Sequence, residues 1–165
     1  MSDPTTNLLD LDLGQVDTSY PVIKGGIYDM VVKNIEVVDN KSQDGKNLKI
    51  VLATTAPTTS VNNEKFEPGQ LVTTQLSLKT KSEKRDEAGM KEIIVKRVAT
   101  FLQATRPPVI GIKGSDLFDG SIATKCNVFV GRSVRIKLDA LPEGRDMASG
   151  KTLPPRNEVT QFIKV

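Results

Sequence analysis

The first strong strand signal is Gly26-Ile-Tyr-Asp-Met-Val-Val-Lys-Asn-Ile-Glu-Val-Val38. Its β-branched and apolar residues are typical of one long strand. The chain is then expected to turn over residues 39–46, where Asp44-Gly45 is a common hairpin signal. A second strand is predicted over 47–55, since alternate residues there are apolar. The chain therefore opens its folded part with two adjacent antiparallel strands.

The pattern downstream changes from strand to helix and back to strand. A third strand is predicted over 70–80, and a helix over 88–105 that Pro107-Pro108 stops. The remaining segments are predicted to be a polar loop over 56–69, a loop with a helical turn over 109–130, a fourth strand over 132–140, a Pro/Gly-rich loop over 141–156 and a last strand over 157–165.

The order β-β-β-α-β-β matches the OB-fold, a five-stranded Greek-key barrel. The long first strand, the helix between strands three and four and the long loop between strands four and five all fit that barrel. Strand spacing alone also fits an ordinary sandwich, and the position of the helix favours the barrel. We therefore predict a mainly β protein with one OB-fold domain over 20–165, preceded by a flexible acidic arm over 1–19.

The composition argues against catalysis. Histidine is absent from the 165 residues, which removes the usual proton carrier near neutral pH and the commonest metal ligand. The single cysteine, Cys126, lies in an apolar run and is expected to be a buried structural thiol. Gly144 to Thr152 resembles a phosphate-binding loop, but five residues separate its glycines where four are needed, and Pro154-Pro155 blocks the following helix. We read it as a hairpin turn and predict no enzyme activity, no cofactor and no metal.

The charge is unevenly distributed. The formal net charge is +3, but residues 1–19 contain four Asp and no Lys or Arg, so the rest carries +7 from 23 basic and 16 acidic residues. A basic body favours a polyanionic partner, for which the acidic arm could compete. The sequence shows no secretion signal and no apolar run of membrane-spanning length, so we expect a cytoplasmic protein that does not enter membranes.

A single strand of nucleic acid would lie across strands two and three, between the loops over 39–46 and 141–156. Basic side chains from separate segments are predicted to gather there, together with a second basic stripe on strand four. The candidate nucleic-acid-binding residues are Lys41, Lys46, Lys49, Phe66, Lys79, Lys81, Lys84, Arg85, Arg132, Arg135, Arg145, Lys151 and Arg156.

Aromatic surfaces for base stacking are scarce, at 4% of the sequence with no Trp. Phe101 is expected on the face of the helix that packs in the core, and Phe129 and Phe162 are expected in the core of the barrel. Phe66 lies in a polar loop, so a role in the core accounts for it less well than for the other aromatic residues. Tyr20 and Tyr28 are the other candidates for base contact. The protein is therefore expected to hold a strand mostly by charge.

The chain resembles the OB-fold single-stranded DNA-binding proteins of tailed bacteriophages. The resemblance rests on Tyr20-Pro-Val-Ile-Lys-Gly-Gly-Ile-Tyr28, on Phe129-Val-Gly131-Arg-Ser-Val134 and on Asn157-Glu-Val-Thr-Gln-Phe162. It implies a viral protein, in the host cytoplasm, that coats single strands during DNA replication or recombination. It also implies partners among the phage replication or recombination proteins.

The leading hypothesis is a largely sequence-independent single-stranded DNA-binding protein. Two alternatives stay open at this point: a β-barrel domain for protein interaction or virion assembly, and an inhibitor of a host nucleic-acid enzyme whose acidic arm mimics nucleic acid. The sequence leaves open a homo-oligomer and the choice between DNA and RNA.

Overall fold

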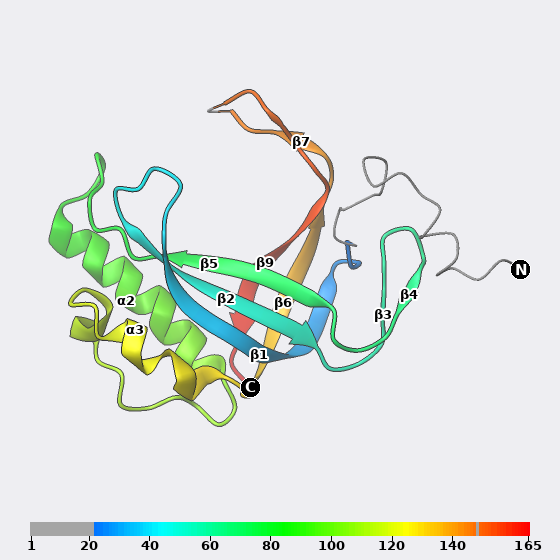
Figure 1. The fold of residues 1–165 in the computed structure, drawn as a ribbon, viewed down its shortest axis with the longest axis horizontal. Helices are drawn as coiled ribbons and strands as arrows, with labels where there is room; N and C mark the ends of the chain where they lie inside the picture. The colour runs from blue at the N-terminus through cyan, green and yellow to red at the C-terminus, as the bar shows by residue number, and fades with distance from the viewer. Residues whose placement is uncertain (1–21, 148) are drawn as a thin grey trace, which may run out of the picture.

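The long strand β1 (Gly26–Asp39) lies at the centre of one antiparallel sheet. The computed structural model describes residues 22–147 and 149–165. Its main sheet has five strands in the order β5-β2-β1-β6-β9, and Figure 1 shows that the sheet is strongly curved. The strands beside β1 are β2 (Lys46–Thr54), β5 (Leu71–Ser77), β6 (Ser133–Leu141) and β9 (Arg156–Ile163).

A bulge in β1 keeps its apolar residues in the core. Met30 and Val32 are buried, and strict alternation would place Asn34 next to them. The register with β2 shifts between Val32 and Asn34, so that Ile35 is buried instead and Asn34 is exposed. A one-residue shift reverses which face each side chain takes, and the bulge thereby restores the apolar phase after Val32.

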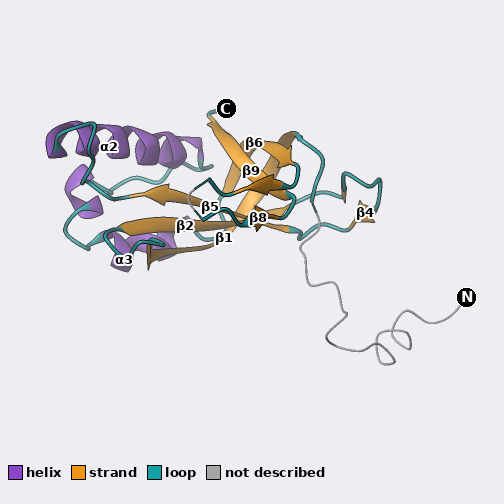
Figure 2. Ribbon diagram, turned by 90° about the horizontal axis from the view of Figure 1, so that it is seen from above, coloured by secondary structure: helices purple, strands orange, loops and turns teal. Residues whose placement is uncertain are grey.

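The two edge strands of the sheet lie against each other. β5 and β9 stand at opposite ends of the strand order, yet they are in contact. Figure 2 shows β6 and β9 running steeply across the direction of β1, β2 and β5. The curvature therefore folds one continuous sheet over a single interior.

Helix α2 (Glu87–Ala104) covers one end of that interior. It begins at Asp86, whose carboxylate accepts a hydrogen bond from the Gly89 N–H at 2.8 Å, as expected of an N-cap. The segment after it forms η2 (Gly114–Leu117), α3 (Ile122–Lys125) and η3 (Cys126–Phe129). No helix in the described ranges has the length and apolar character that crossing a membrane requires.

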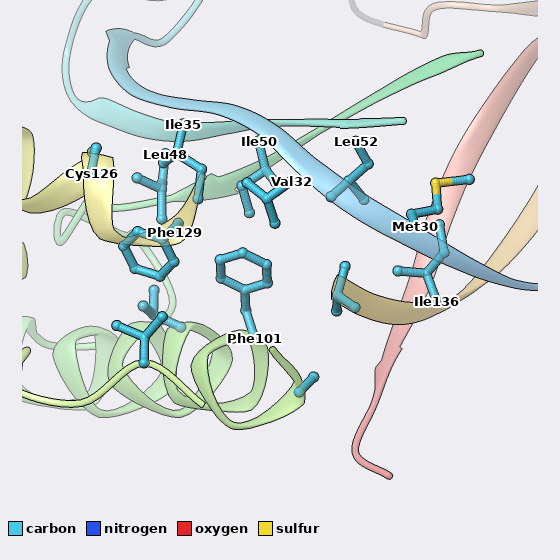
Figure 3. Close-up of a cluster of buried hydrophobic side chains, with 14 of the residues drawn as sticks. Met30, Val32, Ile35, Leu48, Ile50, Leu52, Phe101, Cys126, Phe129 and Ile136 are labelled. Carbon is cyan, nitrogen blue, oxygen red and sulfur yellow. The ribbon is translucent and has the colours of Figure 1, made fainter. Parts of the chain in front are cut away.

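Three phenylalanines connect the helices to the sheet. Phe101 of α2 and Phe129 of η3 are fully buried and stacked with ring centroids 5.6 Å apart. Phe162 of β9 approaches Phe101 at 4.9 Å. Figure 3 shows both buried rings beneath Val32, Leu48 and Ile50. The expected burial of Phe101 and Phe129 is confirmed, while Phe162 is partly buried and packs against the core.

Two short hairpins extend the loops of the sheet. β3 (Thr58–Thr59) pairs with β4 (Lys65–Phe66), and β7 (Gly144–Arg145) pairs with β8 (Thr152–Leu153). They lie in the segments over 56–69 and 141–156 that are predicted to be loops, so the β3–β4 pairing adds to the prediction. The stretch that resembles a phosphate-binding loop is a hairpin turn in which Gly150 has a φ of +69°, so its interpretation as a turn is confirmed.

The mainly β prediction is confirmed, and each of the five long strands and the helix lies within a few residues of its expected position. The segment over 109–130 has more helix than the single turn expected. Gly114 begins the first of its three short helices, and Gly120 precedes the second. The proposed arm over 1–19 and Tyr20 lie outside the described residues.

We predict that Phe101→Ala lowers the free energy of unfolding by about 3–5 kcal/mol, because the ring joins helix and sheet in a fully buried site. Urea titration followed by circular dichroism measures the loss. Phe66→Ala is the matched control, since Phe66 is only half-buried and stands outside the main core cluster. Equal losses in the two variants would contradict this account of the core.

Candidate nucleic-acid interface

The outer face of β2 and β5 is polar with few charges. Lys49 and Val51 of β2 lie beside Gln75 and Thr73 of β5, in the registered pairs Lys49–Gln75 and Val51–Thr73. These side chains are half-buried or exposed, in opposite phase to the buried residues of both strands. The Lys49 ammonium is 3.8 Å from the carboxylate of Glu36. Lys49 therefore points outward as predicted, but it is the single cation among these two strands' central outer positions.

The β1–β2 loop positions one of the candidate lysines. Asp44 accepts hydrogen bonds from Lys79, from Asn40 at 2.8 Å and from Ser42 at 2.8 Å. The Lys79 ammonium first, and then the other two donors, hold the pKa of the Asp44 carboxyl well below its usual range. Lys79 follows β5, so this contact fixes the end of β5 to the loop.

Two further candidates belong to the same loop. Lys46, the first residue of β2, pairs with the Asp39 carboxylate at the end of β1. Lys41 is exposed, and within the described part of the chain it makes no ion pair. Of these two lysines, Lys46 is therefore paired with a carboxylate and Lys41 faces only solvent.

A pocket of about 640 Å³ opens beside this loop. It lies between the loop, the end of β5, the first turn of α2 and the segment that leads into α3. Three candidate residues line it, namely Lys46, Lys79 and Lys81. Its other lining residues are Val37, Asp44, Gly45, Leu78, Thr80, Glu87, Lys91, Leu117, Phe118, Gly120, Ile122 and Ala123.

Two pocket residues, Phe118 and Lys91, were missed by the sequence reasoning. The Lys91 ammonium lies over the Phe118 ring, 5.3 Å from its centroid, and is 3.1 Å from the Glu87 carboxylate. Phe118 is half-buried against the core. The sequence contains one signal for Phe118, which is the one aromatic residue in the glycine-rich segment between Gly114 and Gly120.

The remaining candidates after β5 are exposed. Lys81 and Arg85 line a second, shallow pocket with Asp86 and Glu87, so nearby carboxylates dilute the basic character there. Lys84 is exposed too, and only its backbone N–H is engaged, by the Ser82 hydroxyl at 3.1 Å. This segment extends the cationic edge of the first pocket outward.

A second group of candidates lies at the opposite end of β1. Arg145 and Lys151 are exposed on the β7–β8 hairpin, and Arg156 is exposed at the start of β9. Phe66 is half-buried in the β3–β4 hairpin, opposite Thr58. Figure 1 shows both hairpins extending away from the sheet, far from α2. Most of the candidates therefore form two groups, one toward each end of β1.

Arg132 and Arg135 join neither group. β6 is separated from β2 by β1, so their stripe lies beside another part of the sheet. Arg135 donates to Asp29 at 2.9 and 3.3 Å, and chiefly this contact, with help from Arg106, lowers the pKa of the Asp29 carboxyl. Arg132 donates to the backbone carbonyls of Val128 and Pro107. Both guanidinium groups hold chain segments together.

Two other features bear on the chemistry of the site. No group of three or more Cys, Asp or Glu side chains within 22–147 and 149–165 is arranged to hold a metal ion. Cys126 is buried, which raises the pKa of its thiol and confirms its expected burial. Tyr28 shares the inner phase of β1 with Met30 and donates to the Lys24 carbonyl at 2.6 Å.

We predict that Asp116→Asn destabilises the fold at neutral pH and much less in acid. Lys125, and then the Lys113 N–H, donate to this carboxylate and lower its pKa. A carboxyl with a lower pKa in the folded chain stabilises it above the unfolded pKa, and this contribution is lost as the pH falls through the folded pKa. Urea midpoints across that range test the sign. Exposed Glu143→Gln is the control, and an equal gap at every pH would contradict the prediction.

No protein-family model matches the sequence, and no curated protein matches it. The function must therefore be inferred from the geometry of the described residues.

Proposed function

We propose that the protein is an OB-fold barrel that binds single-stranded DNA with little sequence preference and without catalysing a reaction. In this assignment β1, β2, β5, β6 and β9 are the five barrel strands. The contact between the edge strands β5 and β9 supports closure, and the position of α2 between β5 and β6 supports the OB topology.

One observation carries the functional proposal. Cationic side chains from separate segments stand near both ends of β1, the strand next to β2, and OB-folds use the face of their second and third strands, here β2 and β5, for nucleic acid. Lys46, Lys79 and Lys81 gather at the β1–β2 loop, while Arg145 and Lys151 stand on the β7–β8 hairpin. A strand laid across the face would meet phosphate-binding groups at both ends.

The chemistry of these groups favours recognition of the backbone over the bases. Lysines neutralise phosphates as point charges, and such contacts carry no sequence information. The face between the two groups presents short polar side chains such as Thr73 and Gln75, with no exposed aromatic ring. Charge should therefore supply most of the affinity, and the bound strand should be tolerant of sequence.

We predict that the full chain binds labelled oligo-dT with an affinity that falls steeply as salt rises. Each phosphate neutralised on a single strand contributes about 0.7 to the slope of log affinity against log salt. Lys81→Ala should reduce that slope by about 0.7, because the Lys81 ammonium lines the pocket and makes no ion pair within residues 22–147 and 149–165. Fluorescence anisotropy at several salt concentrations measures both.

Lys96→Ala is the matched control for that titration, since Lys96 is exposed on α2 outside both pockets and pairs with Glu92. Its slope should equal that of the unmodified chain. Binding that ignores salt, or no binding, would refute the proposal. No binding together with a discrete oligomer indifferent to DNA would favour the assembly alternative.

We also predict that Asp44→Asn tightens binding about fivefold at low salt. The substitution keeps an oxygen for Asn40 and Ser42, removes a charge that repels phosphate and releases the Lys79 ammonium. An interaction of ~1 kcal/mol between exposed charges corresponds to that factor. Glu92→Gln breaks a comparable lysine pair outside the pocket and should leave the affinity unchanged. If Asp44→Asn and Glu92→Gln tightened binding equally, the gain in affinity would come from the net charge alone and the prediction would be wrong.

A further inference from the structure

The pocket beside the β1–β2 loop has an apolar interior. Leu78, Leu117 and Ile122 contribute buried side chains to its lining, and the half-buried ring of Phe118 adds an aromatic surface. Its volume of about 640 Å³ falls in the range of small-molecule sites, about 300–1,000 Å³. The space is therefore larger than an inorganic ion needs and suits an organic group with an apolar surface.

The edge of this pocket is cationic. Four lysines line it, against the carboxylates of Asp44 and Glu87, which leaves two net positive charges; the lysines are Lys46, Lys79, Lys81 and Lys91. They come from β2, from the segment after β5 and from α2. A ligand that matches this lining combines a flat apolar part with neighbouring anionic groups.

Phe118 supplies the surface for the flat part. The Lys91 ammonium already lies over the ring, so the ring is placed where a cation or a π-system can stack on it. Lys91 has a long flexible stem and can move from the ring to a phosphate. Base stacking on an aromatic side chain is tolerant of base identity, in keeping with low sequence preference.

The pocket lies at the end of β2 and β5 that adjoins the β1–β2 loop. Lys46 begins β2 and Lys79 follows β5, and both line the pocket. A single strand of DNA that runs over β2 and β5 toward this end would therefore reach the pocket. Resting on the proposed DNA binding, we propose that the pocket takes one unstacked nucleobase of the bound strand, its ring on Phe118 and the adjoining phosphates on Lys79 and Lys81.

The test uses the full chain and oligo-dT that carries 2-aminopurine at one position. Binding should change the fluorescence of the probe at the position that occupies the pocket and much less elsewhere. Phe118→Leu should abolish that difference and weaken binding about fivefold to 100-fold, while the salt slope stays unchanged because no charge is removed. Phe118→Tyr keeps the ring and should retain both signals.

Ile110→Ala is the control, because it removes an exposed apolar side chain that lies outside both pockets and outside the candidate residues. Circular dichroism verifies that each variant is folded. Salt-dependent binding by the unmodified chain, with unchanged affinity and probe signal in Phe118→Leu, would overturn the pocket proposal and leave the DNA-binding proposal standing. A peptide of residues 1–19 is tested as well. If it binds the unmodified chain but not Phe118→Leu, and the DNA affinity is the same for both, the pocket belongs to the arm and the pocket proposal is overturned. No DNA binding by the unmodified chain would overturn both.

Discussion

The fold depends on one strand that serves two halves of a sheet. β1 pairs with β6 over Gly26–Val31 and with β2 over Met30–Asp39, so its two ends belong to different neighbours. The bulge after Val32 bends the strand and keeps Ile35 in the core after the bend. Without this change of phase, either half of β1 would turn its apolar residues toward solvent, and β5 could not reach β9.

The same strand arranges the candidate interface. The end of β1 leads into the loop whose Asp44 holds Lys79, and its beginning lies beside the two hairpins that carry Phe66 and Arg145. The two cationic groups are therefore separated by the length of β1. A rigid spacing of this kind suits an extended single strand, since the cationic groups are ordered before the ligand arrives.

The strands and the helix could be predicted because their signals are local. Alternation over 47–55 and helical spacing over 88–105 depend only on residues near one another in sequence. The pocket could not be predicted in this way, since Phe118 meets Lys91 and Lys79 only after the sheet and helix pack. The positions of Arg132 and Arg135 were equally hidden: a basic residue on a strand looks the same in sequence whether it faces a phosphate, an aspartate or a carbonyl.

Pairing within the protein does not remove a lysine from a binding surface. Exposed ion pairs such as Lys46–Asp39 and Lys79–Asp44 contribute about 0–1 kcal/mol to stability, so they cost little to exchange for a phosphate. Their effect is to hold the ammonium near the pocket before binding. Arg132 differs because its donors satisfy backbone carbonyls of Val128 and Pro107, which a phosphate would leave without partners. The kind of acceptor therefore distinguishes Arg132, whose release would leave two carbonyls without partners, from lysines whose exposed carboxylate partners lose little when the pair opens.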